Sequence, residues 1–237
     1  MLASFFVFLF RPTYLISILI VLLPPSLINF LWLKSSRFKV FIFSLVTTLL
    51  FAPPVELSAR LANVWDVQSV LPRVFGLLPI ENLVFAFFNF FWVLSFYEYF
   101  IDHDRSAKIS KGIKYLVMLY CFLFILIFNL FFINQSLIAL NYHLLAVIIL
   151  LIPGIIIFSI KPKILKKVWL PTIFFAYIFF IYELISLLVG SWWWPGDYLL
   201  PLNLLGHTFP LDDVVIWYFL STPVLIGGYE FFVDDSR

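Results

Sequence analysis

Residues 79–102 read PIENLVFAFFNFFWVLSFYEYFID, and residues 210–234 repeat the pattern as PLDDVVIWYFLSTPVLIGGYEFFVD. In each stretch a proline and an acid open an apolar segment that ends in Tyr-Glu and a last aspartate. Pro79 and Pro210 are 131 residues apart, and the two Tyr-Glu pairs are 132 apart. The chain therefore contains a duplicated unit, and each copy places a carboxylate where an apolar helix begins. An acid is costly there and indicates a function.

The composition places the chain outside the soluble globular class. Of its 237 residues 64% are hydrophobic and 12% are charged, and the mean hydropathy is +1.08. Apolar stretches of about 20 residues recur along its whole length, as spanning helices require. We expect an all-α integral membrane protein with helices at 13–33, 40–62, 79–101, 114–133, 138–160, 168–189 and 211–232. No length remains for a soluble catalytic domain.

The remaining global features exclude several classes of protein. The net charge of +2 does not indicate a nucleic-acid partner. One cysteine, Cys121, excludes an intrachain disulfide and a Cys-rich metal or redox centre. The first ten residues carry no early positive charge, so we interpret them as retained rather than as a signal peptide.

The basic residues predict the orientation. Of the 15 Lys and Arg residues, all but Arg11, Arg60 and Arg73 fall in the first, third and fifth loops or the C-terminal tail. Positive charge accumulates on the cytoplasmic side. We therefore expect a non-cytoplasmic N-terminus and a cytoplasmic C-terminus, with both acidic motifs on the non-cytoplasmic face.

Further matched positions divide the chain into two units of three helices. The matched pairs are Pro24 with Pro153, Glu56 with Glu183, and Trp65 with Trp192. We expect a first unit at 1–105, a linker helix within 106–136, and a second unit at 137–237. The linker helix gives both units the same orientation, so the repeat is parallel, and a site between the units is expected.

The acids Glu81, Asp212 and Asp213 are the first candidates for chemistry. A carboxylic acid just inside a membrane can keep its proton because the charged form is poorly solvated there. An alternative is purely structural, since proline and an acid both suit the first turn of a helix.

Glu56 and Glu183 lie deeper in their predicted helices. Arg60 follows Glu56 by one helical turn, which favours a simple ion pair for that acid. Glu183 has no such neighbour and is therefore a functional candidate.

Aromatic side chains make up 21% of the chain, and their ring faces can stabilise a cation in a dry cavity. Most are expected to anchor helices at the membrane interface or to pack. Trp65, Trp192 and Trp194 precede the acidic motifs and are the expected exceptions. The three histidines share no metal-ligand spacing, so no metal is expected. His207 is either a donor to the acidic cluster or a loop residue.

Nucleotide chemistry and serine hydrolysis have no support in the sequence, and four further acids are assigned no chemistry. The chain has no nucleotide-binding or serine-hydrolase motif. The acids Asp102, Asp104, Asp234 and Asp235 are interpreted as solvated helix ends.

Together the three-helix unit, its tryptophan and the Pro-hydrophobe-acid motif resemble the lycopene cyclase domain of heterodimeric bacterial carotenoid cyclases and their fused archaeal and fungal relatives. The resemblance covers essentially the whole chain, with one domain in each half. It implies cofactor-independent acid–base cyclisation of an acyclic carotenoid such as lycopene within the bilayer. It also implies membrane lipids as surroundings, and leaves open a partnership with other carotenoid-pathway enzymes.

These observations define a set of expected site residues. The expected catalytic residues are Glu81, Asp212, Asp213 and Glu183, and the expected substrate-binding residues are Asn82, Glu56, Trp65, Trp192, Trp194 and His207. Asn82 departs from the family pattern, which has two acids, so the two copies are expected to divide the labour. The ring type and the number of ends cyclised stay open.

Other functions fit parts of the pattern. A transporter, a carotenoid-binding scaffold and a C50 carotenoid cyclase remain alternatives. An integral prenyltransferase would need Asp-rich motifs longer than Asp212-Asp213.

Overall fold

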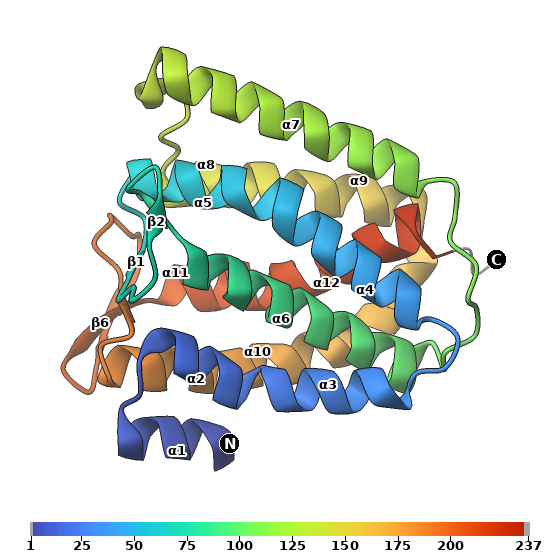
Figure 1. The fold of residues 1–237 in the computed structure, drawn as a ribbon, viewed down its shortest axis with the longest axis horizontal. Coiled ribbons are helices and arrows are strands. Elements are labelled where there is room, and N and C mark those ends of the chain that lie inside the picture. The colour runs from blue at the N-terminus through green and yellow to red at the C-terminus, as the bar shows by residue number, and fades with distance from the viewer. Residues whose placement is uncertain (1, 235–237) are drawn as a thin grey trace.

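A computed structural model describes residues 2–234 as a bundle of seven long apolar helices (Figure 1). These helices run Tyr14–Trp32, Arg37–Leu61, Ile80–Ile101, Ile113–Ile133, Tyr142–Ile160, Pro162–Leu188 and Leu211–Phe232. The shortest has 19 residues, which is enough to cross a hydrocarbon core about 30 Å thick. The predicted all-α multi-pass membrane protein is confirmed, and the predicted helix bounds are wrong by at most six residues, at Pro162.

Most spans consist of more than one helical element. The first three spans comprise α2 (Tyr14–Val21), α3 (Leu23–Trp32), α4 (Arg37–Val46), η1 (Thr47–Phe51), α5 (Ala52–Leu61), α6 (Ile80–Phe96) and η2 (Tyr97–Ile101). The fourth span is α7 (Ile113–Ile133). The last three comprise α8 (Tyr142–Ala146), η4 (Val147–Leu151), α9 (Ile152–Ile160), η5 (Pro162–Ile164), α10 (Leu165–Leu188), α11 (Leu211–Asp213), η6 (Val214–Tyr218) and α12 (Phe219–Phe232). Outside the spans lie a short helix, α1 (Leu2–Phe10), and a 3-10 turn, η3 (Gln135–Leu137).

Prolines explain two wide turns within the spans. The π-helical turns η1 and η4 end two residues before Pro53 and Pro153, whereas a third, η6, ends five residues before Pro223 and so lies beyond the reach of that proline. Proline lacks an N–H, and its ring clashes with the carbonyl four residues earlier, so the preceding turn opens. Residues five apart, rather than four, then come onto one face of the helix.

Within the described residues, six short strands gather at one end of the bundle, which we call the strand end. They are β1 (Asp66–Val67), β2 (Arg73–Val74), β3 (Leu78–Pro79), β4 (Trp192–Trp193), β5 (Pro201–Leu204) and β6 (His207–Pro210). Antiparallel β1 and β4 join the two halves, with Val67 opposite Trp192. We call the opposite end, with the connections 33–36 and 102–112, the basic end (Figure 1).

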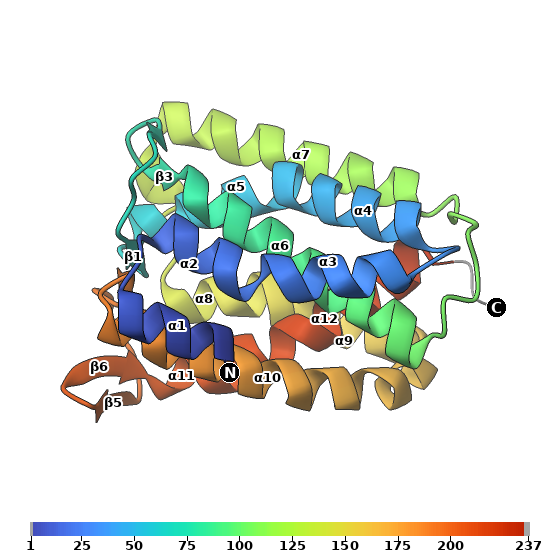
Figure 2. The same ribbon diagram turned by 60° about the horizontal axis from the view of Figure 1, so that its bottom comes forward.

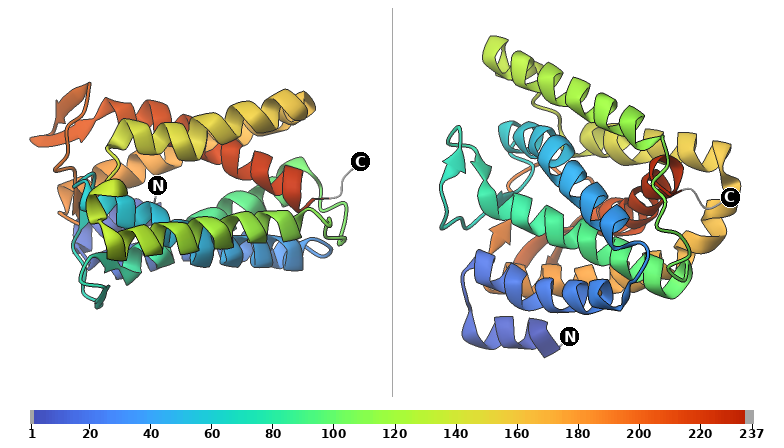
Figure 3. Two further views of the ribbon diagram at one scale, coloured as in Figure 1. Left: turned by 90° about the horizontal axis from the view of Figure 1, so that it is seen from above. Right: turned by 45° about the vertical axis from the view of Figure 1, so that its right-hand side comes forward.

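The spans differ in how much neighbouring helices cover them. In the first half α6 packs on α3 and α4, and in the second half α12 packs on α9 and α10. Helix α1 lies along α10, as Figure 2 shows. Helix α7 lies on the outside, against η1 and α5 (Figure 3), and only 11% of its most apolar window is buried. The rest of its surface has the apolar character of a lipid contact.

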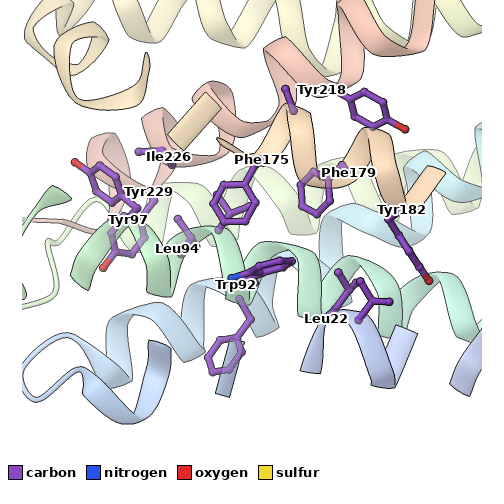
Figure 4. Packing of buried hydrophobic residues seen from close by; sticks show 14 of the residues in the cluster. Leu22, Trp92, Leu94, Tyr97, Phe175, Phe179, Tyr182, Tyr218, Ile226 and Tyr229 are labelled. Carbon is purple, nitrogen blue, oxygen red and sulfur yellow. The ribbon is translucent and has the colours of Figure 1, made fainter. Parts of the chain in front are cut away.

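Aromatic rings from both halves form the centre of the core. Trp92 of α6 meets Phe175 and Phe179 of α10 edge to face, with ring centroids 5.2 and 6.2 Å apart (Figure 4). Tyr97 and Tyr229 lie side by side in the same view, near the basic end. The core is therefore continuous between the halves and positions the polar groups described below.

Candidate functional site

A cavity of about 430 Å³ lies between the first three and the last three spans, with part of α7 along one side. Its wall is mainly apolar and aromatic. The carboxyl groups in its lining are those of Glu56, Glu183 and Asp213, all near the strand end and all buried. Val67 of β1 and Trp192 of β4 cover that end.

Glu56 accepts two hydrogen bonds at the cavity wall. The indole Nε1 of Trp65 donates to its Oε2 at 2.9 Å, and the amide of Asn82 donates to its Oε1 at 2.6 Å. The expected i,i+4 pairing with Arg60 is replaced, because Arg60 instead donates to Asp66 and to the carbonyl of Trp65.

Glu183 accepts three hydrogen bonds in the equivalent place. Trp192 and Trp194 both donate from Nε1 to its Oε1 at 2.7 Å, and the hydroxyl of Tyr218 donates to its Oε2 at 3.0 Å. In each half the glutamate is therefore bound by the tryptophan nine residues later. The pairing of β1 with β4 brings the two tryptophan loops together, and the rings of Trp65 and Trp194 lie 6.2 Å apart.

Asp213 is the one acid of the repeated Pro-x-acid motif that lines the cavity. It is 3% exposed, and it accepts from the hydroxyl of Tyr142 at 3.2 Å. Tyr218 contacts both Asp213 and Glu183 and so links the two carboxyl groups. Asn82 occupies the matching place in the first half, where it cannot supply a proton.

Glu81 and Asp212 serve the loops outside the cavity. Glu81 accepts from the backbone N–H groups of Val70 and Leu71, both at 2.7 Å, and from the Ser69 hydroxyl. Asp212 accepts from the backbone N–H of Leu199 at 2.7 Å. Neither lines the cavity, so the first acid of each motif holds a loop while the second position faces the interior.

The other expected residues also divide into those that line the cavity and one that does not. Trp65, Trp192, Trp194 and Glu56 line the cavity, whereas His207 is exposed in the hairpin of β5 and β6. His143 lies close to the acidic pair instead, with Nε2 3.3 Å from Asp212.

Three aromatic residues beside the acids are absent from the set expected from the sequence. They are Tyr142, Trp217 and Tyr218. With 3.6 residues per turn, positions 213 and 218 fall on different faces, but the π turn η6 brings them onto one. The sequence carries no close signal for this turn, since the next proline, Pro223, follows Asp213 by ten residues.

At the basic end, the Tyr-Glu pairs that end the two repeated stretches form a buried cluster. Each pair contacts the pair of the other half. The Tyr97 hydroxyl donates to Glu230, and the Tyr229 hydroxyl donates to Glu98. These are matched positions of the repeat, and each tyrosine bonds the glutamate of the other half.

Two matched lysines complete this cluster. Lys39 Nζ lies 3.3 Å from Glu98 and 2.6 Å from Asp234. The Lys167 Nζ lies 3.0 Å from Glu230 and 2.7 Å from Asp102. Each lysine therefore binds one acid of its own half and one of the other. We refer to these six ionisable residues as the lysine cluster.

The interpretation of the nearby aspartates as solvated is wrong for Asp102 and Asp234, which are 1% and 4% exposed. Their lysine partners are distant in sequence, so they could not be inferred from local spacing. Asp235 lies outside the described residues. Within residues 2–234, Asp102, Glu230 and Asp234 are close enough to hold a metal ion, and Lys39 and Lys167 already supply positive charge there.

Asp104 joins the first and third connections at the basic end. It accepts from the backbone N–H groups of residues 34–36 and from the Ser36 hydroxyl. Burial would raise the pKa of Asp104, but these donors outweigh it and hold the pKa below its usual range. At the strand end, burial raises the pKa of the Tyr198 hydroxyl.

The fold and the cavity define a multi-pass α-helical membrane protein with three buried acids in an apolar chamber between two related halves. No known protein family, curated protein or solved structure matches the chain. The site itself therefore carries the functional argument.

Proposed function

We propose that the protein is a carotenoid cyclase that closes ionone-type rings on the ψ ends of an acyclic carotenoid such as lycopene. The observation that carries the proposal is the position of Asp213. This buried acid faces an apolar chamber, and Tyr218 connects it to a second carboxyl group, Glu183. A proton donor and a proton acceptor are thus linked through one hydroxyl in a mainly apolar cavity, where water is scarce.

The reaction needs one proton to enter and one to leave. Asp213 donates its proton to the terminal double bond, and the resulting tertiary cation is attacked by the neighbouring double bond, which closes the six-membered ring. Glu183 accepts the proton that the ring cation then loses. It already receives three hydrogen bonds, so acceptance is its role in the resting site. The product is an isomer of the substrate, and no oxidant or reductant is needed.

The aromatic wall suits the cationic intermediate. Trp65 packs edge to face on both Trp194 and Trp217, with centroids 6.2 and 5.8 Å apart. All three line the cavity beside the acids. Ring faces attract a cation by about 0.5–2 kcal/mol each when water is excluded.

The remaining expected residues receive positioning roles in this proposal. Glu81 and Asp212 hold the loops at the strand end, and Asn82 with Glu56 shapes the first-half wall. Because Asn82 stands where the family pattern has a second acid, only one motif of the chain can donate a proton to the cavity. The two ends of a substrate would therefore be cyclised in turn.

Expression in a lycopene-producing bacterium tests this function. We expect cyclic carotenoids of unchanged mass to replace lycopene, because the reaction is an isomerisation. Pigments are separated by chromatography and identified by absorption and mass. Lycopene that stays acyclic while the protein accumulates in the membrane would contradict the proposal, and co-purified unchanged lycopene would indicate a scaffold.

We also propose that the basic end faces the cytoplasm, because the connections there hold most of the Lys and Arg residues. A green fluorescent protein fused after Arg237 is expected to fluoresce, since it folds in the cytoplasm. Alkaline phosphatase fused at the same place should be inactive. The reverse pair of results would overturn this orientation.

A further inference from the structure

The cavity is long, and the seventh span shows this most clearly. The residues of this span that line the cavity include Asp213, Trp217, Ser221, Gly228 and Phe232. They recur at intervals of four or seven residues, which keeps them on one helical face. Asp213 and Phe232 are 19 residues apart, which corresponds to about 28 Å of helix. The cavity therefore runs from the acids almost to the basic end.

The first half contributes a matching wall. Phe43, Thr47, Phe51 and Val55 follow one another at intervals of four and line the same cavity. A volume of about 430 Å³ spread over this length leaves a narrow cross-section. The cavity therefore has the shape of a groove that fits one extended chain.

One side of this groove is open to the outside of the bundle, between the ends of the spans. Leu119 of α7 and Ile148 of η4 both line it, yet they are 46% and 44% exposed. Their helices run in opposite directions, and each residue lies six positions from the start of its span. The two residues therefore touch both the groove and the outer surface of the bundle, at different depths.

Gly228 keeps the far part of the groove free. A Cβ added there would meet no atom within 4 Å, although Gly228 lies in the lining. A larger side chain at this position would project into the groove without first displacing the backbone.

We propose that the groove binds a linear isoprenoid chain in extended form, with one end group at Asp213 and the tail along α12 toward Phe232. The chain enters sideways from the bilayer through the slit between Leu119 and Ile148. An extended chain advances about 3.3–3.6 Å per three bonds, so about 24 bonds fill the groove. The isoprenoid nature of the chain and the identity of its end group rest on the proposed function, but the length and direction of the groove do not.

Binding in lipid nanodiscs tests the groove separately from catalysis. Lycopene is titrated in, and quenching of tryptophan emission is measured, because Trp65, Trp194 and Trp217 line the groove. Gly228→Phe is expected to weaken this binding by about tenfold, since the new ring occupies the path of the chain. Val215→Phe, on the exposed side of the same span, is the matched control and should bind as the unmodified protein does.

A second pair of variants tests the slit. Both substitutions are at exposed positions, where a larger side chain does not disturb the packing. Leu119→Phe is expected to slow the onset of quenching several-fold with the final extent unchanged. Met118→Phe, which is exposed but does not line the groove, should leave the rate unaltered.

The outcomes separate the two proposals. Equal lycopene binding by the Gly228→Phe and Val215→Phe proteins, or no quenching in the unmodified protein, would overturn the groove. Selective loss of binding in Gly228→Phe, in a protein that forms no cyclic pigment, would keep the groove and reject the cyclase.

Discussion

Replacing Asp213 by asparagine is expected to reduce ring formation by about 10²–10⁴-fold, the usual contribution of a general acid. Asparagine keeps the shape of the side chain and can still accept from Tyr142, so the cavity should remain intact. It cannot donate a proton to a double bond. The measurement is the fraction of lycopene converted per unit of membrane protein.

Asp212→Asn is the matched control for this variant, because the two aspartates are adjacent and both buried. Asp212 holds the loop through the N–H of Leu199, and an asparagine oxygen can still accept that bond. We expect Asp212→Asn to keep most of the activity. Equal losses in the two variants would remove the assignment of Asp213 as the proton donor.

Lys39→Met is expected to destabilise the protein by about 3–5 kcal/mol, because it leaves buried charge without its partner. Lys39 is the positive group 2.6 Å from Asp234 and 3.3 Å from Glu98, and both acids are almost fully buried. Methionine has a similar length but offers no donor. The measurement is the free energy of unfolding in detergent, with the yield of folded protein as a second readout.

Two further variants separate the charge effect from a loss of packing. Lys163→Met removes an exposed lysine near the same end and should change stability little. The double variant Lys39→Met with Asp234→Asn removes an acid together with its partner and should recover part of the loss. A Lys39→Met protein as stable as Lys163→Met would show that the lysine cluster does not hold the halves together.

The sequence was sufficient to predict the seven spans. A spanning helix must satisfy its backbone hydrogen bonds internally and present about 20 apolar residues to lipid, so its signal is local. The errors are at span starts. Tyr142 begins the fifth helix four residues later than expected, and Pro162 begins the sixth six residues earlier, within a lysine-rich segment.

Repetition also identified the positions that matter, but not their partners. The repeat matches Glu56 with Glu183, but it does not show that each glutamate binds a tryptophan from the loop that follows its own helix. Tyr97-Glu98 and Tyr229-Glu230 were visible as repeated dipeptides, whereas each tyrosine bonds the glutamate of the other copy. A sequence aligns equivalent residues, while the packing of two related halves brings each residue against the opposite copy.

The sequence alone therefore determined the class of protein, the duplication and the short set of intramembrane acids, because hydropathy and spacing are properties of the chain itself. The tertiary structure alone decided which acid of each motif faces the cavity. Glu81 and Asp212 turn to loop N–H groups, while Asn82 and Asp213 turn inward. Adjacent residues on a helix point about 100° apart, so one reaches the loop and the next the interior. Which is which depends on how the helix packs between the two halves.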